Sequence, residues 1–420
     1  MVPSQFPSSL PTTAMATHLE SSKRTASPPS APGEQVRFGS GTLHVLTLTP
    51  FFPSTEEPTK GCFIAEPLRH LKQYGVVSTV IAVQSLYTSR NRPSPSEPAR
   101  WVRYPQLPGN FGLSSAGGLL YARLVRSVRR LHREQPFDVI HAHSALPCGH
   151  AGALLARELR IPYVVTVHGL DVFNACFQSG TAAEWRRRAS SAVYREAQAV
   201  ICISDKVRRI LTAGQEEVRS AVVYNGVDPE LFSPTSQASP QSTDILVVGN
   251  LLLGKGHGLV LRAMARIRSA FPGLRCSIIG EGRDRGKFVA LAKSLGIEQQ
   301  VRFLGSKGRL EVAEAMRSCT VFALPARFEA LGCVYLEAMS CGKPAIACRG
   351  QGIEEIIQHG RNGWLVSDNV DELVEALSIL LPSLERRTQI GAAARQTILD
   401  GLTLSHQAQQ LAEIYRGRVE

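Results

Sequence analysis

A glycine-rich loop with a lysine lies in residues 245–258, which read ILVVGNLLLGKGHG. Residues 249–255 have the spacing of a nucleoside-triphosphate loop, but that loop needs a hydroxyl side chain after its lysine to bind magnesium, and Gly256 follows Lys255. Glycines that let the backbone approach an anion, the lysine charge and a helix beginning near His257 still predict a phosphate site. The alternative is a strand-to-helix turn with a solvated lysine.

Two glutamates with seven residues between them form a second candidate for chemistry, in the stretch FEALGCVYLE. A helix beginning near Ala330 would place Glu329 at its cap and Glu337 about two turns further along roughly the same face. The cap carboxylate can accept hydrogen bonds from sugar hydroxyls, and the amides of residues 331–333 would face an anion. Glu337, which apolar residues surround, would need a partner such as a ribose. The alternative is a capping residue and a solvated helix position.

Three histidines lie in or directly after two apolar runs that are typical of buried strands. The run YVVTV leads into His168, with Asp171 close behind, and polar residues at strand ends predict a ligand site. His141 and His143 lie two apart in VIHAH, so they face the same side of a strand. Such a pair can be half of a metal site, but the sequence offers no third ligand at a suitable spacing and no D-x-D pair. We therefore predict cleft-lining or packed histidines and no metal.

The elements that must position these residues alternate along the chain from residue 43. The expected strands before a polar linker at 233–243 are LHVLTL, VSTVIAV, VIHAH, YVVTV, AVICIS and AVVY, and those after it are DILVVG, RCSIIG, VRFLG, TVFALP, PAIAC and GWLV. Strands separated by helical patterns predict an α/β fold with two doubly wound parallel sheets. Ligands on such sheets bind beyond the carboxyl ends of the strands, so we expect the site in the cleft between two domains. RCSIIG, for example, ends at Gly280, and Gly282 follows two residues later.

Composition indicates a soluble globular protein of two domains. The chain has 420 residues, of which 44% are hydrophobic and 20% charged, without a run of about 18 apolar residues that could span a membrane. Residues 1–36 are rich in Ser, Pro and Thr, which predicts a disordered tail and no signal peptide. Nine cysteines without a C-x-x-C pair fit reduced thiols in the cytoplasm.

Positive charge predicts an acidic partner. The net charge is +12, which suits nucleic acid, anionic lipid or a phosphorylated substrate, and no nucleic-acid-binding motif accompanies it. Residues 119–133 place four arginines on one helical face, and EWRRRASSAVYR at 184–195 is also basic. These segments are either the exposed sides of helices packed on the first sheet or a surface that attaches peripherally to an anionic membrane.

Taken together, the ordered motifs resemble the retaining GT-B glycosyltransferases of family 4. The resemblance rests on the Glu, seven residues, Glu pattern in RFEALGCVYLEAMSCGKP, the KG loop after GN, and the segments VYNGVD, VHGLD and GIEEII. It runs from about residue 43 to the C-terminus. It implies an acceptor-side Rossmann-like domain at 37–232, a linker at 233–243, a nucleotide-sugar-binding Rossmann-like domain at 244–400, and a helix in 401–420 that packs back on the first domain.

The resemblance also implies roles for individual residues. Lys255 would bind the donor diphosphate, Glu329 the sugar hydroxyls and Glu337 the nucleotide ribose, while His168 would contact the transferred sugar from the opposite domain. The implied catalytic set is His168, Glu329 and Lys255. The implied donor-binding set is Gly61, Asn250, Lys255, Gly280, Gly282, Glu329, Leu331, Gly332, Cys333 and Glu337. The implied acceptor-side residues are His143 and Asp171.

Two positions depart from the pattern of that family. Asn250 stands where many members have an arginine, so Arg327, Arg283 or another cation must compensate, or leaving-group stabilisation is weaker. The N-terminal loop often carries two adjacent glycines, whereas this chain has Gly61 preceded by Lys60.

The expected function is transfer of a sugar from a nucleotide-diphosphate sugar, UDP- or GDP-linked, to a hydroxyl acceptor, with no cofactor and no metal. Retention of configuration is implied by the resemblance, with the phosphate oxygen itself taking the acceptor's proton. The expected acceptor is a lipid-linked glycan of cell-surface or exported polysaccharide, which places the protein in the cytoplasm at the inner face of the membrane. The alternatives are a nucleotide-sugar isomerase of the same fold and a phosphate-loop NTPase.

Overall fold

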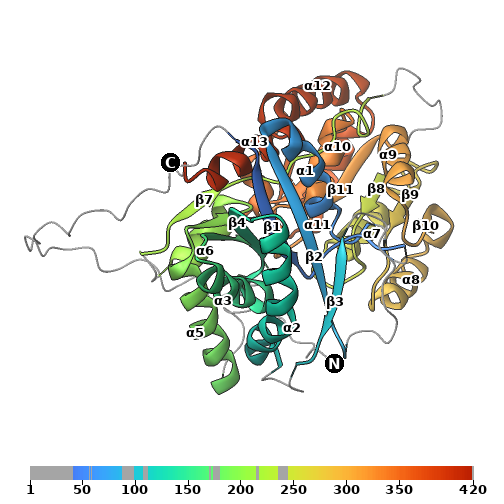
Figure 1. The fold of residues 1–420 in the computed structure, drawn as a ribbon. Helices are drawn as coiled ribbons and strands as arrows, with labels where there is room; N and C mark the ends of the chain where they lie inside the picture. Colours follow the sequence, from blue (N-terminus) through green and yellow to red (C-terminus); the bar gives the residue numbers. More distant parts are fainter. Residues whose placement is uncertain are drawn as a thin grey trace, which may run out of the picture.

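In the computed structural model, the chain folds into two parallel sheets with helices on their faces (Figure 1). The predicted tail at 1–36, most of the predicted linker and Asp171 lie outside the residues that the structure describes. The described residues are 41–55, 57, 59–87, 99–106, 112–169, 172–173, 180–213, 217–234 and 245–418.

The first sheet has seven parallel strands in the order β3-β2-β1-β4-β5-β6-β7. Its strands are β1 (Leu43–Thr49), β2 (Val76–Ser85), β3 (Arg100–Tyr104), β4 (Val139–His143), β5 (Tyr163–Val167), β6 (Ala199–Cys202) and β7 (Ser220–Val222). The order reverses between β1 and β4, as in doubly wound folds, where ligands bind beside the point of reversal. Sequence patterns missed β3, because this edge strand reads RWVRY and lacks a run of β-branched residues.

The second sheet repeats this arrangement with six parallel strands in the order β10-β9-β8-β11-β12-β13. Its strands are β8 (Ile245–Val248), β9 (Cys276–Ile279), β10 (Val301–Phe303), β11 (Val321–Leu324), β12 (Ala345–Cys348) and β13 (Trp364–Val366). The central strands β8, β11 and β12 are buried along their whole length, which explains why they are continuous apolar runs.

Helices connect the strands and cover both sheets. In the first domain they are α1 (Cys62–Leu71), α2 (Gly112–Glu134), α3 (His150–Leu159), α5 (Thr181–Glu196) and α6 (Asp205–Thr212). In the second they are α7 (His257–Ile267), α8 (Arg285–Ser294), α9 (Arg309–Ser318), α10 (Cys333–Ser340), α11 (Val370–Leu380) and α12 (Leu384–Gly401). The apolar face that the sequence predicts for α2 is buried against the first sheet. It consists of Leu120, Leu124, Val128 and Leu131.

The last helix, α13 (Leu404–Tyr415), returns to the first domain and packs against α1 (Figure 1). The hydroxyls of Tyr74 and Ser405 lie 2.7 Å apart, and the Tyr415 side chain is fully buried. The C-terminal segment therefore ties the second domain to the first.

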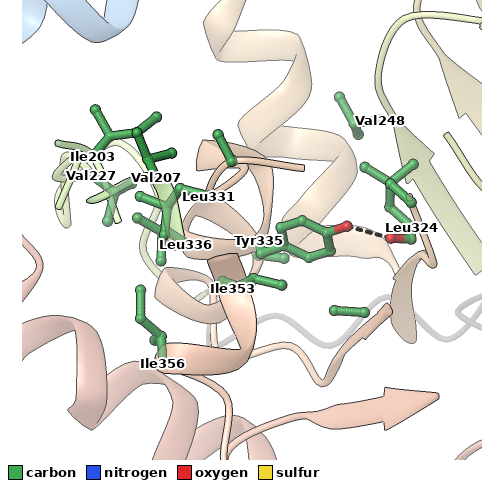
Figure 2. Packing of buried hydrophobic residues seen from close by; sticks show 14 of the residues in the cluster. Ile203, Val207, Val227, Val248, Leu324, Leu331, Tyr335, Leu336, Ile353 and Ile356 are labelled. Atoms are coloured by element: carbon green, nitrogen blue, oxygen red, sulfur yellow. Dashed lines mark hydrogen bonds between the residues drawn. The ribbon is translucent and has the colours of Figure 1, made fainter. Parts of the chain in front are cut away.

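A shared apolar core joins the two domains behind the cleft. Ile203, Val207 and Val227 of the first domain belong to one buried cluster with Leu331 and Leu336 of the second (Figure 2). In the same view the Tyr335 hydroxyl donates a hydrogen bond to the carbonyl oxygen of Leu324 and so fixes α10 to the end of β11. This packing holds the carboxyl ends of the two sheets face to face.

Candidate active site

The glycine loop between β8 and α7 carries Lys255 to the carboxyl end of the second sheet. Gly256 precedes α7 with a φ of 82°, a left-handed conformation that favours glycine. A Cβ at this position would lie 2.5 Å from the carbonyl oxygen of Pro325. The loop is also held by the Arg327 N–H, which donates to the carbonyl of Gly254 at 2.7 Å. The lysine is thereby brought against the segment that follows β11.

Lys255 meets Glu329 there, with 2.5 Å between Lys255 Nζ and Glu329 Oε2. The expected helix start near Ala330 is wrong, because α10 begins at Cys333. Gly332 caps the helix with a φ of 85°, and a Cβ there would lie 2.5 Å from the Tyr335 ring, so the turn needs a glycine. Glu329 is therefore a loop residue and not a helix cap.

Glu337 lies on α10 and is 4% exposed. Its carboxylate accepts a hydrogen bond from Arg309 at the start of α9. The other edge of the same guanidinium donates hydrogen bonds to both carboxylate oxygens of Glu66 on α1, at 2.8 and 2.9 Å. The buried Glu337 carboxylate therefore has its partner, Arg309, within the protein. No sequence pattern indicated that Arg309 and Glu66 form this cluster with Glu337. Burial raises the pKa of Glu66, and the charge of Arg309 opposes this effect.

Three histidines form a row at the carboxyl ends of β4 and β5, in which His141 and His143 are buried and His168 is partly exposed. The rings of His141 and His143 are 4.3 Å apart, and His143 Nδ1 lies 3.0 Å from His168 Nε2. His141 is also bonded to the hydroxyls of Thr166 and Tyr415, each at 2.7 Å. Burial lowers the pKa of His168 to about 4 and that of His141 to about 3, so both rings are neutral near pH 7. Within the described residues, no group of histidine, cysteine and carboxylate side chains could hold a metal ion.

The segment that follows the histidine row packs on the segment that carries Glu329. Gly169, next to His168, packs so closely on Ala330 that a Cβ at Gly169 would lie 2.4 Å from the Ala330 Cβ. His168 of the first domain and Glu329 of the second are therefore each one residue away from this contact.

Family comparisons agree with this geometry. Residues 230–397 match the family described as Glycosyl transferases group 1, and residues 63–231 match Glycosyltransferase Family 4. The chain belongs to these glycosyltransferases. A D-inositol 3-phosphate glycosyltransferase from Jonesia denitrificans is 30% identical over 306 residues, which cover 66% of this chain and 71% of the relative. One from Stackebrandtia nassauensis is 28% identical over 389 residues, which cover 85% of this chain and 86% of the relative.

Solved glycosyltransferases share the fold. Sucrose-phosphate synthase from Thermosynechococcus elongatus aligns with a TM-score of 0.71 at 19% identity, over 89% of this chain and 98% of that one. Anabaena HepE, solved in complex with UDP and glucose, aligns with a TM-score of 0.68 at 20% identity, over 88% and 98% of the two chains. The predicted GT-B fold, with two Rossmann-like domains facing a cleft, is confirmed.

Lys206 of this glycosyltransferase reaches across the cleft, although its sequence context gave no sign of it. Its Nζ donates to Gly350 O and Gln351 Oε1, both at 2.8 Å, and that Gln351 oxygen also accepts the Glu329 N–H at 2.9 Å. The backbone N–H groups at the start of α6 donate to the Glu355 carboxylate at 2.7 Å each. This explains the second glutamate of the GIEEII motif, which satisfies a helix N-terminus of the opposite domain.

The remaining glycines of the implied donor set pack tightly on neighbouring backbone, and the cysteine contacts the opposite domain. Gly61 precedes α1, and a Cβ there would lie 2.5 Å from the Phe51 backbone. Gly280 and Gly282 pack directly against the backbone of the loop that follows β8. Cys333 opens α10, and its sulfur accepts a hydrogen bond from Asn225 of the first domain at 3.3 Å.

Asn250 is exposed in the glycine loop, and both cations named as compensating for it face carboxylates. Arg327 pairs with Asp368 at 2.9 Å, and Arg283 lies 3.8 Å from Asp284. Either cation would have to leave or share its carboxylate to meet a diphosphate. The sequence-based role of Asp171 falls outside the described residues.

The lowered pKa values in the histidine row predict a loss of stability in acid. Because the pKa of His168 is lowered to about 4 when folded, the unfolded chain binds more protons between pH 4 and its ordinary value of 6.5. The free energy of unfolding should therefore fall as pH drops through this window, by up to about 1.4 kcal/mol per pH unit for each such histidine. We expect urea unfolding of His168→Phe at pH 7 and pH 5 to show a smaller difference than the wild type. Equal differences would contradict the assignment.

Proposed function

We propose that this glycosyltransferase moves a sugar from a nucleotide-diphosphate sugar to a hydroxyl acceptor with retention of configuration and without a metal. The observation that carries the proposal is that Lys255 and Glu329 of the second domain form an ion pair, while Gly169, the residue after His168, packs on Ala330, the residue after Glu329. A cation, a hydroxyl-binding carboxylate and a neutral imidazole are the groups that a sugar diphosphate needs around its glycosidic bond.

Lys255 and Glu329 neutralise each other in this structure. A bound donor would compete for both, with its diphosphate drawing the lysine and its sugar hydroxyls drawing the carboxylate. As the glycosidic bond loosens, negative charge grows on the diphosphate, and Lys255 with the amides of residues 331–333 would meet it. Preorganised donors of this kind contribute about 3 to 4 kcal/mol each to lowering the barrier.

His168 would face the transferred sugar from the first domain. Burial lowers its pKa to about 4, so at neutral pH it offers an uncharged ring that hydrogen-bonds hydroxyls and does not repel Lys255. No protein group is assigned as general base, because the leaving phosphate oxygen lies on the face that the acceptor attacks and can take the acceptor's proton.

Nucleotide binding is the first test of this function. Thermal unfolding would be measured with UDP, GDP, ADP and ATP, each with magnesium and with a chelator. A ligand at about 100 times its Kd stabilises the folded state by about 2.7 kcal/mol, which shifts the midpoint by several degrees. We expect a shift with UDP or GDP that survives the chelator. A shift seen only with ATP and magnesium would overturn the proposal.

Asn250→Arg tests whether this loop position faces the diphosphate. The added guanidinium would supply a second cation beside Lys255, so we expect nucleoside diphosphate to bind unchanged or more tightly. Charged hydrogen bonds of this kind are worth about 1.5–3 kcal/mol, and the upper limit of the gain is therefore about a hundredfold in Kd. Titration calorimetry of the variant and of Asn250→Ala would measure it. Weaker binding by the arginine variant would place Asn250 away from the phosphates.

The acceptor is proposed to be a glycan on a lipid of the inner leaflet. Arg123 and Arg126 of α2 are exposed and have no ion-pair partner among the described residues, and each surface cation contributes about 1 kcal/mol to binding an anionic membrane. Among the described residues, no helix could span a bilayer. Co-sedimentation with vesicles at low salt should therefore require anionic lipid, and equal binding to neutral vesicles would exclude this surface.

A further inference from the structure

The three side chains of Glu66, Arg309 and Glu337 form a charge cluster where the two domains meet. Glu66 comes from α1 of the first domain, and Arg309 and Glu337 come from α9 and α10 of the second. The side chains are 14%, 20% and 5% exposed, so all three charges are largely removed from water. Groups buried in this way cost stability unless they are paired and hydrogen-bonded.

Arg309 uses both edges of its guanidinium, which fixes its orientation. Nε and Nη2 donate to the two oxygens of Glu66 at 2.8 and 2.9 Å, and Nη1 donates to Oε1 of Glu337. The planar group also lies over the Phe232 ring, with 4.7 Å between its central carbon and the ring centroid. A two-point fork of this geometry cannot be reproduced by lysine.

Glu337 keeps one oxygen for another partner. Its Oε1 accepts a hydrogen bond from Arg309. Among the residues that the structure describes, none donates a hydrogen bond to its Oε2. The two carboxylates share one guanidinium, so the cluster carries one net negative charge and can accept hydroxyl donors. Burial alone would lower the pKa of Arg309, but the neighbouring carboxylates of Glu337 and Glu66 raise it, so the guanidinium stays protonated.

We propose that Arg309 is a positioning residue of the donor site, which aims the free oxygen of Glu337 at the ribose hydroxyls and is itself held in place by Glu66 of the opposite domain. This inference rests on the proposed function, because it takes the ligand to be a nucleoside diphosphate. Its consequence is that ribose recognition depends on closure of the cleft. When the domains separate, Glu66 leaves Arg309, and the guanidinium that orients Glu337 loses two of its three hydrogen bonds.

Ribose discrimination measures this role directly. The Kd values of UDP and of 2′,3′-dideoxy-UDP, or of the two corresponding guanosine nucleotides, would be determined by titration calorimetry for the wild type. Hydrogen bonds to a charged group are worth about a tenfold to hundredfold change in affinity, so the wild type should prefer the ribonucleotide by about that factor. Arg309→Met should lose most of this preference while binding the dideoxy nucleotide as the wild type does.

Arg309→Met leaves two buried carboxylates without a cation, which destabilises the fold. A second, milder variant therefore tests the same role. Glu66→Gln keeps the shape and removes only the charge that holds Arg309 from the other domain, so we expect a partial loss of the ribose preference. Asp371→Asn is the matched control, because it breaks an arginine–carboxylate pair with Arg266 at the exposed surface of the same domain. It should leave both Kd values unchanged.

The possible results separate the two proposals. A ribose preference that falls in Arg309→Met and in Glu66→Gln but not in the control supports the positioning role. Preferences equal to the wild type in both variants would overturn it and leave the proposed transfer intact. A wild type that binds none of these nucleotides would overturn the proposed function, and the inference would fail with it.

Discussion

Lys255→Met is expected to lower kcat by about 10²- to 10³-fold and to leave the fold intact. The lysine is the cation that the glycine loop carries to Glu329, and removal of one preorganised donor to a developing anion costs about 3 to 4 kcal/mol in the transition state. Methionine keeps most of the apolar stem and removes only the charge. Because Lys255 and Glu329 remain 27% and 17% exposed, their pair contributes at most about 1 kcal/mol to stability.

Turnover of nucleotide sugar and thermal unfolding of the same preparations would test this expectation. Arg266→Met is the matched control, because Arg266 is also ion-paired and lies in the same domain, on α7. It should keep wild-type kcat. A Lys255→Met enzyme within threefold of the wild type would show that the diphosphate is neutralised elsewhere, and Lys206 would then be the first candidate, because it reaches the same cleft from the opposite domain.

Local patterns predicted the elements that carry the site. VIHAH and YVVTV coincide with β4 and β5, and α7 begins at His257, as the glycines before it indicate. These elements are predictable because each buried parallel strand is a short apolar run and each helix start has its own backbone signal. The same rules bring His168 and Lys255 to strand ends that share one cleft.

Contacts between the domains could not be predicted in the same way. Arg309 is separated by 243 residues from Glu66 and by 28 from Glu337, and no local pattern relates residues at such distances. The arginine reads as an ordinary first residue of a polar helix. Its role depends on how α1, α9 and α10 converge, which only the packed fold determines.

The start of α10 was misplaced for a different reason. The sequence EALGC has three good helix formers before its glycine, so a propensity argument begins the helix at Ala330. The fold instead uses Gly332 to turn the chain, and it leaves Glu329 in a loop where its side chain reaches Lys255. The left-handed turn at Gly332, packed on the Tyr335 ring, thus overrode local helix propensity.

Gly256→Ser is the second change with a large expected effect, and it settles the phosphate-loop alternative. A serine here would complete the sequence G-x-x-x-x-G-K-S. The structure leaves no room for it, because the residue has a φ of 82° and its Cβ would lie 2.5 Å from the Pro325 carbonyl oxygen. Left-handed backbone alone costs about 1–2 kcal/mol, and the backbone clash adds to it, so we expect a loss of about 3 kcal/mol or more.

Such a loss would lower the unfolding midpoint by roughly 6–12 °C for a domain of this size. Gly258→Ser is the matched control, since the same substitution two residues further on places its Cβ in ordinary contact, 3.7 Å from Leu291. That variant should be as stable as the wild type or slightly more stable, because serine favours a helix more than glycine does. A stable Gly256→Ser protein that gained magnesium-dependent ATP binding would mean that the loop is a triphosphate site. An unstable one means that the glycine after Lys255 is fixed by packing on Pro325, and that this loop has no place for the hydroxyl that a magnesium-bound triphosphate requires.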